Sequence, residues 1–580
     1  MKKIVIDHLA RVEGCGGIVA TIDGKAVSDV KFYVNEGPRL VERFTIGRTP
    51  EEDVNLVPRI CAICSISHKY AAIRGLEKAL GVKVPPKVTL LRELMHLGEM
   101  IESHSLHVYL LALPDYVGFP NAIAMASKFG FEAKIALEMK QFGNHIMKTI
   151  SGRFIHGENP IIGGFGKWPS GEDLIWIKNR AIQFMPFVLK TVKLFAELNY
   201  PDVPEAETQF ACLNPPQKRF GFVGEEILLS SGETIDVQDY KSLTNEFLVS
   251  HSFCKRSQYK GKPYSVGALA RVNNLGDRLT GEAGNAFQKY YGPRWKKNPL
   301  FNNAAQALEL LYSFERIPTV VDELKKLPDP AVVSYTKKEG KGSGAVEAPR
   351  GTLFHSYEIA KGRIAFSDII TPTAQNAEDI ERYCYIAAQK LLDSGQEDKI
   401  KDRMDLIVRS FDPCISCSVH MVQVKKAPQD DWMGRLTDLK KDQAPIFVGM
   451  GTQSFADDEI GLRLATRLRS LGIKDVWLES EIEQAKENFW QQSIERPLIF
   501  LDAMDSGDNP GKITLISLKH LFWNSTLSHR LLPLVQSDLD FNQLKNSYLL
   551  GIQPGSVKEG EEISKSVLQA VEKIVGLLRN

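Results

Sequence analysis

The sequence predicts two domains of different class: a mainly α-helical domain with small β-elements over residues 1–420, and an α/β doubly wound domain over residues 445–580. From residue 38 to about residue 200, apolar side chains recur at the spacing of buried helices. After residue 445, short apolar strands alternate regularly with helical segments. A polar stretch with two prolines, residues 421–444, lies between the two patterns, and we interpret it as a linker.

The elements of the first domain can be predicted in order along the chain. Residues 1–35 alternate like strands, with glycine-rich turns between them. Residues 87–113 are apolar nearly all round, which predicts a buried core helix. A glycine-rich loop that feeds a hairpin is expected at residues 337–359. Further helices are expected at residues 302–317, 377–392 and 397–411.

The composition excludes several classes of protein. A chain of 580 residues with a formal net charge of +1 has no overall attraction to nucleic acid or anionic lipid. No apolar stretch is long enough to span a membrane, and Asp7, Arg11 and Glu13 interrupt the N-terminal apolar run, which argues against a signal peptide. We therefore expect a soluble cytoplasmic protein whose eight cysteines are thiols or metal ligands.

Four of the cysteines form two Cys-x-x-Cys pairs, Cys61 with Cys64 and Cys414 with Cys417. The i, i+3 spacing at the start of a helix places both thiols of the first pair on one face, where they can bind one metal. Thiolates bind zinc, nickel, copper or iron–sulfur clusters. A structural zinc site is disfavoured, because zinc ribbons close over about 15–20 residues and 350 residues (414 − 64) separate the pairs here. An iron–sulfur site stays an alternative, although the usual clustered run is missing.

The cysteine pairs belong to a longer series of motifs. RVEG, RICAIC with His68 behind it, EAPRG, TPT followed by Asn376, and DPCISCSVH occur in this order. The series resembles the motif set of the nickel–iron hydrogenase large subunit, and residues 92–116 resemble the central helix of its cytoplasmic, multisubunit branch. The resemblance covers residues 1–420. The related quinone-reducing subunit of respiratory complex I shares the fold but lacks the four cysteines, so their presence argues against that interpretation.

The resemblance implies a Ni-Fe(CN)2(CO) centre that cleaves H2 heterolytically. Cys61 and Cys414 would be terminal nickel ligands, and Cys64 and Cys417 would bridge nickel to iron. The Cys414 thiolate would take the proton, since a Lewis-acidic metal beside a basic thiolate suits this reaction. Glu13 would accept the proton next; the alternative for a single glutamate is a solvated surface charge. The family usually has histidine where Cys15 stands, which changes the hydrogen bonding near Glu13.

The resemblance also gives roles to side chains around the centre. Arg350 would lie over the open metal position, held by Asp115 and Asp412, as a preorganised cation. The alternative is a surface arginine paired with Glu347.

Further expected contacts concern the iron ligands and another metal. Pro372 and Thr373 would face the diatomic ligands, and His68 would hydrogen-bond a bridging thiolate, unless it is a buried structural histidine. Glu42 and His420 resemble ligands of the family's third metal, usually magnesium, although the glycine usual in the Glu42 motif is missing. Because no cysteine cluster is left for an electron relay, we expect an iron–sulfur small subunit as partner, together with nickel-insertion and maturation accessory proteins.

Large subunits of this type are made with a C-terminal extension, which is removed after the histidine of DPCxxCxxH once nickel is inserted. Here the extension has 160 residues (580 − 420), and motifs at residues 448–452, 456–461, 501–507, 527–529 and 551–554 resemble the hydrogenase maturation endopeptidase. By that resemblance, the precursor's nickel would be bound by Asp458, Asp502 and His529. The family usually has asparagine where Thr452 stands.

Two other classes of domain are alternatives for the extension. A nucleotide-binding domain is disfavoured because the third glycine of GxGxxG is missing after Gly449 and Gly451. A receiver-like domain would explain the acidic residues but not His529, for which His520 is a nearby competitor as ligand.

The sequence therefore predicts a hydrogenase large-subunit precursor that is fused to its own processing protease and cleaved after His420. Two alternatives stay open. One is an H2-sensing or assembly protein with the same metal site and little turnover. The other is a structural, zinc-bound subunit of an electron-transfer complex.

Overall fold

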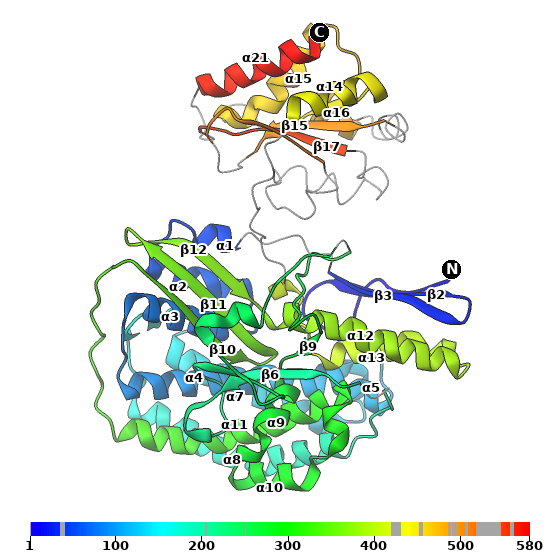
Figure 1. Ribbon diagram of the computed structural model, residues 1–580. Helices are drawn as coiled ribbons and strands as arrows, with labels where there is room; N and C mark the ends of the chain where they lie inside the picture. Colours follow the sequence, from blue (N-terminus) through cyan, green and yellow to red (C-terminus); the bar gives the residue numbers. More distant parts are fainter. Residues whose placement is uncertain are drawn as a thin grey trace. The chain divides into compact units, whose positions relative to one another are not determined.

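The computed structural model describes residues 2–34, 41–203, 206–249, 251–418, 431–451, 456–484, 489, 496–504, 509–517, 547–556 and 562–579 (Figure 1). The chain divides into two compact units, residues 1–420 and residues 421–580, which are described separately. Within the described part of the chain, no helix is both long and apolar enough to cross a membrane.

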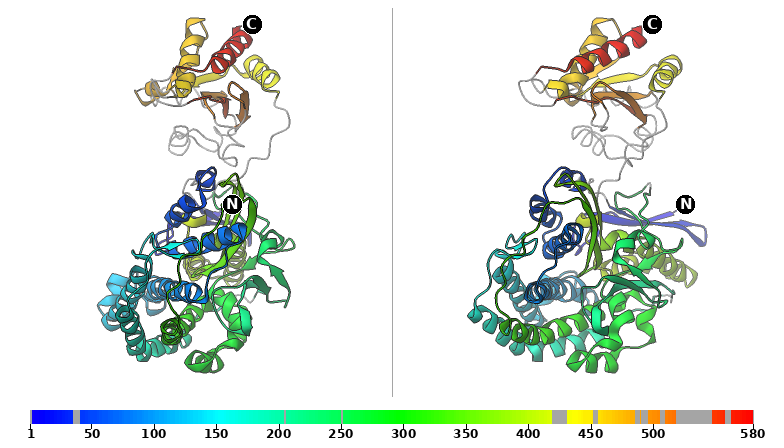
Figure 2. Two further views of the ribbon diagram at one scale, coloured as in Figure 1. Left: turned by 90° about the vertical axis from the view of Figure 1, so that its left-hand side faces the viewer. Right: turned by 60° about the vertical axis from the view of Figure 1, so that its left-hand side comes forward.

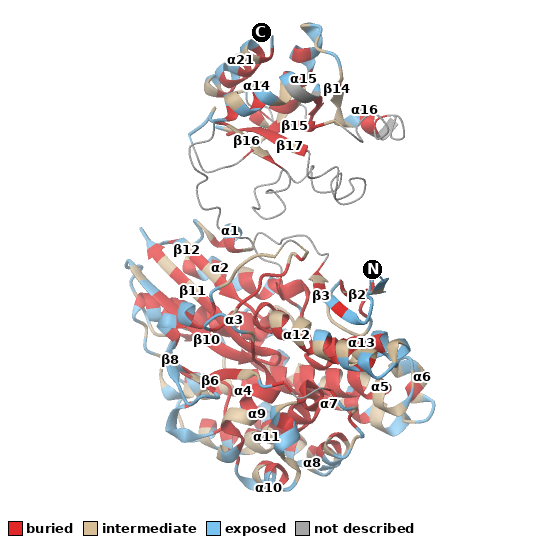
Figure 3. Cartoon of the chain, turned by 45° about the vertical axis from the view of Figure 1, so that its right-hand side comes forward, coloured by how far each residue is buried: buried red, intermediate tan, exposed pale blue. Residues whose placement is uncertain are grey.

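Four long helices form the core of the first unit: α4 (Pro86–Leu106), α7 (Gly130–Ser151), α8 (Gly171–Ala196) and α11 (Asn302–Lys325). Helix α4 packs against α7 and α11, and α11 also packs against α8 (Figure 2). The predicted core helix at residues 87–113 is confirmed as α4 and a π-helical turn, His107–Ala112. Most of α4 is buried (Figure 3), and its buried residues include charged ones such as Glu99.

The other helices of the first unit pack around this core. They are α1 (Val41–Thr45), α2 (Pro50–Leu56), α3 (Ser65–Leu80), α5 (Leu113–Val117), α6 (Ala122–Ala126), α9 (Ala268–Leu275), α10 (Gly281–Tyr290), α12 (Pro372–Asp393) and α13 (Ile400–Ser410). A 3-10 turn, Val57–Ile60, joins α2 to the first cysteine pair, and another, Ser416–Ser418, contains Cys417. The helices predicted at residues 302–317, 377–392 and 397–411 are confirmed by α11, α12 and α13.

The sheets of the first unit are small and mostly antiparallel. One is β1 (Lys2–Ile6), β2 (Gly16–Asp23) and β3 (Ala26–Val34); another is β10 (Gly340–Ala348), β11 (Gly351–Ala360) and β12 (Arg363–Ile370). A third has the order β8 (Thr234–Asp236), β7 (Glu226–Leu229), β6 (Gln209–Asn214) and β9 (Tyr264–Ser265), and β4 (Pro160–Ile161) pairs with β5 (Gly164–Phe165). The strands expected before residue 35 and the hairpin expected at residues 337–359 are therefore present.

Glycines allow helix α3 to lie directly on the β10–β11 hairpin. A Cβ atom added to Gly75 of α3 would lie 2.6 Å from the backbone oxygen of His355, and one added to Gly344 would lie 2.3 Å from the backbone nitrogen of Gly75. Larger residues would force the helix and the hairpin apart. This close packing brings the hairpin turn, which contains Arg350, toward the amino end of α3 and the first cysteine pair.

The second unit contains a five-stranded sheet of order β14 (Val476–Leu478), β13 (Ile446–Gly449), β15 (Leu498–Ala503), β17 (Ser547–Ile552) and β16 (Ile513–Ser517). All pairs are parallel except β16 with β17. One face of the sheet packs against α14 (Trp432–Gln443), α15 (Ile460–Ser470) and α21 (Lys565–Arg579). On the other face, apolar side chains of the sheet pack with Ile482 of α16 (Glu479–Gln484) and with Phe489. Residues 518–546, which belong to the expected double winding, lie outside the described residues.

One boundary differs from the prediction. Residues 432–443, interpreted as part of the linker, form helix α14, and Asp431 caps it by accepting a hydrogen bond from the backbone nitrogen of Gly434 at 3.0 Å. Trp432 and Leu436 are buried in the core of the second unit. The dense charges of this segment hid an amphipathic pattern with apolar residues on one side.

Candidate metal centre

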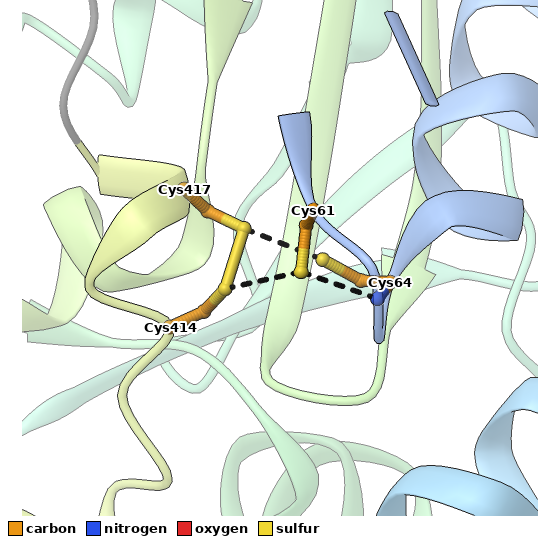
Figure 4. Close-up of side chains that lie close together, drawn as sticks. All are labelled: Cys61, Cys64, Cys414 and Cys417. Carbon is orange, nitrogen blue, oxygen red and sulfur yellow. Dashed lines mark hydrogen bonds between the residues drawn. A yellow bond between two sulfur atoms is a disulfide. The ribbon is translucent and has the colours of Figure 1, made fainter. Parts of the chain in front are cut away.

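Four cysteine side chains from two distant segments meet in the first unit (Figure 4). The Sγ atoms of Cys61 and Cys414 are 3.5 Å apart, and those of Cys64 and Cys417 are 3.4 Å apart. All four Sγ atoms lie within 4.8 Å of one another, and all four side chains are buried. Cys414 and Cys417 are joined as a disulfide in the structure, so metal binding requires their reduced form. The expected convergence of the two pairs is observed.

The first pair lies where a 3-10 turn changes into a helix. Cys61 has extended backbone angles after the turn, and Cys64 is the residue immediately before α3. The backbone N–H of Cys64 donates a hydrogen bond to the Cys61 sulfur at 3.4 Å. Hydrogen bonding from Cys64 lowers the pKa of the Cys61 thiol, whereas that of Cys64 is raised, so Cys61 is the first of the two to become a thiolate.

A buried glutamate, which the sequence analysis missed, holds the amino end of α3 in place. Glu99 of α4 accepts hydrogen bonds from the backbone nitrogens of Ile66 at 2.7 Å and Ser67 at 3.0 Å, and from the Ser67 hydroxyl. Burial raises the pKa of Glu99 to about 8, although its hydrogen bonds with Ser67 and Ile66 oppose the shift. An acidic residue within a long, mostly buried helix is the signal that could have identified it.

The second cysteine pair is held by residues that the motifs had singled out. The Cys414 backbone N–H donates to the Thr373 hydroxyl at 2.8 Å, near the start of α12, where Pro372 is the first helical residue. The backbone oxygen of Glu13 accepts from the Ile415 nitrogen at 2.9 Å, and its carboxylate accepts from the Ser416 nitrogen at 3.1 Å. Glu13 is half-buried. Thr373 and Glu13 thus lie beside Cys414, and the roles expected of them stay predictions.

Arg350 is almost fully buried, at 3% exposure, in the turn between β10 and β11. Its Nε donates to the Asp412 backbone oxygen at 2.9 Å, and its Nη2 lies 3.1 Å from the Asp412 carboxylate. The Nη1 atom is buried and has no hydrogen-bond partner among the described residues. Coulombic interactions with Asp412, Cys64, Cys61 and Glu13 outweigh the effect of burial and raise the pKa of Arg350, so the cation faces the cysteine site.

Of the two expected partners of Arg350, Asp412 contacts it and Asp115 does not. Asp115 instead forms ion pairs with Arg11 and Arg409. The alternative interpretation, in which Arg350 pairs with Glu347, is wrong, because Glu347 binds Arg271 at 2.8 Å.

A second buried ion cluster, which the sequence analysis also missed, contacts the turn between β10 and β11. Arg271 of α9 donates to Glu309 of α11 at 2.5 Å and 2.6 Å, and also to the backbone oxygen of Pro349 at 3.1 Å. His104 of α4 lies 2.8 Å from the same Glu309 carboxylate. The charges compensate one another, which makes their complete burial tolerable.

A hydrogen bond from His68 to a bridging thiolate was expected. Among the hydrogen bonds of the described residues, none joins His68 to a cysteine sulfur. Its Nδ1 lies 3.0 Å from His355 Nε2, and its backbone nitrogen donates to the Cys64 oxygen at 3.1 Å. Burial lowers its pKa to about 3, so the ring is neutral. His68 lies one helical turn after Cys64, and its bond to a bridging thiolate stays a prediction.

The expected magnesium ligands are only partly described, since His420 lies outside the described residues. The Glu42 carboxylate accepts from the Ile369 nitrogen at 2.8 Å, and burial raises its pKa to about 7. The Lys255 ammonium lies 3.9 Å from it and 2.6 Å from Glu246. In the described part of the chain, the four cysteines are the only group of three or more side chains arranged to hold a metal.

Asp458 and Asp502 of the second unit lie at the same edge of its sheet. Asp458 follows β13 in a 3-10 turn, Ala456–Glu459, and Asp502 is near the carboxyl end of the neighbouring strand β15. The first turn of α15 touches both strand ends, because a Cβ on Gly461 would lie 2.0 Å from the Leu501 oxygen and 2.3 Å from the Met450 oxygen. The third expected ligand, His529, and its competitor His520 lie outside the described residues.

The donor set fits a soft or borderline transition metal, because four buried sulfur ligands and a nearby guanidinium favour bound thiolates. Over 422 residues, the chain is 40% identical to the sulfhydrogenase 1 subunit alpha of Pyrococcus furiosus, with 73% of this chain and 98% of that protein covered. The chain belongs to the nickel-dependent hydrogenase family. The family model, described as nickel-dependent hydrogenase, matches residues 39–133 and 229–420.

Other relatives of this hydrogenase support the assignment. The sulfhydrogenase 2 subunit alpha of Pyrococcus furiosus is 41% identical over 431 residues, which cover 73% of this chain and all of that protein. Among solved structures, an NAD+-reducing [NiFe]-hydrogenase in the H2-reduced state matches with a TM-score of 0.66 and 28% identity, over 72% of this chain and all of that chain. The chain is therefore the catalytic large subunit of a nickel-dependent hydrogenase, an oxidoreductase.

Proposed function

We propose that the four cysteines hold a Ni-Fe(CN)2(CO) centre, with Cys61 and Cys414 as terminal nickel ligands and Cys64 and Cys417 as bridges to iron. The observation that carries the proposal is the pairing of the sulfur atoms. Cys61 faces Cys414 at 3.5 Å, and Cys64 faces Cys417 at 3.4 Å, so all four sulfur atoms are close enough to hold one centre. When bound, this centre supplies the heterolytic cleavage of H2 to protons and electrons.

Protein side chains around the centre then stabilise charge and move the proton. The Arg350 guanidinium is fixed by Asp412 before the reaction and presents an uncommitted N–H, which suits charge that develops above the cysteines. The Cys414 sulfur takes the proton, and Glu13, whose carboxylate binds the Ser416 nitrogen, accepts it next. Because Glu13 is half-buried, it can pass the proton on to solvent. Pro372 and Thr373 line the iron side, next to the Cys414 backbone.

The electrons are proposed to leave through an iron–sulfur small subunit. Two observations support this partner. The relatives are named as subunits, and the described residues hold no second cysteine cluster that could carry electrons. A cytoplasmic location, a magnesium ion at Glu42 and His420, and accessory proteins for nickel insertion and maturation belong to the same proposal.

Elemental and infrared analysis of the purified chain tests this assignment. About one nickel and one iron per chain, with infrared bands from carbonyl and cyanide, are expected. Zinc alone would contradict the centre. Turnover with an artificial electron acceptor then distinguishes an enzyme from an H2 sensor or assembly protein with the same site.

For the second unit we propose a nickel-dependent endopeptidase that cleaves after His420. In a parallel sheet, ligands bind beyond the carboxyl ends of two neighbouring strands whose connections run in opposite directions. Strand β13 is followed by β14 on one side and by β15 on the other, so β13 and β15 form such a point. Asp458 and Asp502 follow these two strands, and two carboxylates with His529 would form a three-ligand metal site.

Nickel added to purified, iron-loaded full-length chain should produce fragments of 420 and 160 residues (580 − 420). If the chain processes itself, the rate is independent of protein concentration. The Asp502→Ala variant should stay intact, whereas Asp475→Ala, a matched control at the amino end of β14, should be cleaved normally. A chain that stays intact with nickel under all conditions would contradict the protease proposal and favour a permanent domain.

A further inference from the structure

The outer side of helix α8 carries a row of exposed apolar side chains that has no part in the mechanism proposed above. Ile175, Ile182 and Leu189 are 42%, 48% and 37% exposed, and Pro186 between the last two is also exposed. A spacing of seven residues is close to two helical turns, so the row lies on one side of the helix and extends over about 21 Å. We call these four residues the α8 stripe. A contiguous apolar surface of this kind marks an interaction site.

The neighbouring helices hold α8 in place beneath this stripe (Figure 1). The opposite side of α8 is buried in the core of the first unit and packs against α11. At one edge of the helix, Lys178 pairs with Asp322 of α11 at 2.6 Å. At the other edge, Arg180 pairs with Glu138 of α7 at 3.5 Å. The α8 stripe is therefore part of a helix that is anchored on both edges.

The residues of α8 are arranged so that the helix is complementary to an antiparallel copy of itself. Ile175 and Leu189 are each seven residues from Ile182. When Ile182 faces Ile182 of a second copy, each Ile175 meets a Leu189. The charges favour the same arrangement, because Glu172 is exposed near the amino end and Lys193 is exposed near the carboxyl end. An antiparallel copy brings each glutamate close to a lysine, whereas a parallel copy would bring like charges together.

We propose that two copies of this chain associate through the α8 stripe, with the two helices antiparallel about a two-fold axis at Ile182. An interface with two-fold symmetry uses the same patch on both subunits, so the patch must be complementary to itself. The α8 stripe meets this condition in its apolar contacts and in its charges. Because such an interface closes on itself, the product is a dimer and not a filament.

The iron–sulfur small subunit of the proposed function is the other candidate for this surface. Helix α8 packs against α11 and α7, and neither of these helices carries a cysteine of the candidate metal centre. A subunit that takes up electrons must approach the centre, which favours a surface formed by the elements that carry the cysteines. The α8 stripe therefore suits a second copy of the chain.

The size of the surface indicates a weak dimer. A standard interface buries about 800 Å² on each partner, whereas the α8 stripe is one side of one helix. Two exposed aromatic residues, Trp176 of α8 and Phe131 of α7, enlarge the apolar surface toward α7. The ring of Phe131 lies 6.1 Å from that of Phe187 of α8, measured between their centres. Because interfaces below the standard size belong to weak complexes, we expect a dissociation constant in the micromolar range.

Analytical ultracentrifugation of the purified full-length chain at about 1–100 µM tests the interface, because this range includes a micromolar dissociation constant. The unaltered chain should approach twice the mass of one chain as its concentration rises. Ile182→Glu should raise the dissociation constant about 100-fold or more, because like charges then meet at the axis. Ile123→Glu is the matched control, since Ile123 is an 87% exposed isoleucine on α6 and lies outside the stripe. This control should associate like the unaltered chain.

Charge variants test the position of the axis and the direction of the helices. Ile182→Lys alone should stay monomeric, whereas an equimolar mixture of Ile182→Lys and Ile182→Glu should associate, because the axis then brings opposite charges together. Glu172→Lys and Lys193→Glu should each weaken association about 3- to 10-fold. The double variant should regain the original association, because exchanging the two charges preserves the pairs between the copies.

Three results would each overturn the proposal: an unaltered chain that stays monomeric up to about 100 µM, an Ile182→Glu variant that associates like the unaltered chain, or a mixture that does not associate. Loss of a copurifying iron–sulfur subunit in Ile182→Glu would also overturn it and assign the α8 stripe to that subunit. All of these variants should bind as much nickel as the unaltered chain, so the test of the dimer is independent of the proposed function.

Discussion

Replacing Asp412 with asparagine should lower the free energy of unfolding of the first unit by about 3 kcal/mol. Asp412 is 2% exposed and Arg350 is 3% exposed, so the pair is shielded from water. Removing one partner of a buried ion pair costs roughly 3–5 kcal/mol, because the other charge stays buried without compensation. Asparagine keeps the shape of the aspartate side chain, and its oxygen can still accept a hydrogen bond from Arg350. The expected loss of unfolding free energy therefore lies at the lower end of that range. Its amide nitrogen, however, would face the Gln306 amide that now donates to the carboxylate at 3.0 Å.

The difference in unfolding free energy between the unaltered chain and Asp412→Asn depends on pH, and its sign follows from the pKa of Asp412. Burial alone would raise the pKa of Asp412, but Arg350 lowers it below its ordinary value of 3.8. A group whose pKa is lowered in the folded state contributes stability above the pKa of the unfolded state and loses it as the pH falls through the folded value. The difference between the unaltered chain and Asp412→Asn should therefore be complete at neutral pH and shrink below about pH 4.

Hydrogen exchange measured by mass spectrometry suits a chain with two units, since each peptide reports on its own unit. Protection of the β10–β11 hairpin should fall in Asp412→Asn, while peptides of the second unit stay unchanged. Asp405→Asn is the matched control, because Asp405 is partly exposed and its partner Arg409 keeps a second ion pair with Asp115, so the substitution should cost less than about 1 kcal/mol. Protection equal to that of the unaltered chain, within about 0.5 kcal/mol, would refute the reasoning and mean that Asp412 does not compensate the Arg350 charge.

Three further predictions concern the cysteines, the proton acceptor and the second unit. Cys64→Ser should lose nickel in elemental analysis, whereas the buried but distant Cys212→Ser should retain it. Glu13→Gln should slow the isotope exchange between H2 and deuterated solvent about 100-fold or more, with metal content unchanged. Isotope exchange at the original rate would assign the proton transfer to another group. Asp457→Asn should weaken exchange protection of residues 551–556 and 562–564 by about 2–4 kcal/mol, since the carboxylate accepts from two backbone nitrogens and both donors of Ser564; unchanged protection would contradict this role.

The cysteine site could be predicted from the sequence because its information is local. A Cys-x-x-Cys spacing fixes two sulfur atoms on one side of a turn, and sulfur ligands in two such pairs imply a shared metal. Glu13 and Thr373 were found in the same way, since motif position placed them near Cys414. The partners of ion pairs are different, because they depend on tertiary packing. Nothing in the sequence distinguishes Arg350 from Arg11 or Arg409 as the partner of Asp115.

Some missed residues did leave a signal. Glu99 and Glu309 are acidic side chains inside helices that are mostly buried. Burying an isolated carboxylate is costly, so each of them implied a specific partner. The structure supplies these partners, the amino end of α3 for Glu99 and Arg271 for Glu309. Helix α14 is the opposite case, in which lysines and aspartates on the exposed side masked the apolar residues that anchor it.

The order in which the site is assembled follows from where its parts lie in the chain. Cys61 and Cys64 are fixed by α3 and Glu99 within the first hundred residues, whereas Cys414 and Cys417 lie directly before the boundary between the two units. Three backbone N–H groups hold this last segment, through bonds to Glu13 and Thr373. At about 0.5–1.5 kcal/mol each, these three bonds contribute only about 1.5–4.5 kcal/mol. A metal bound by both pairs would therefore add the strongest link between the segment and α3. This is the physical reason to expect that metal insertion and the final position of the C-terminal segment are coupled.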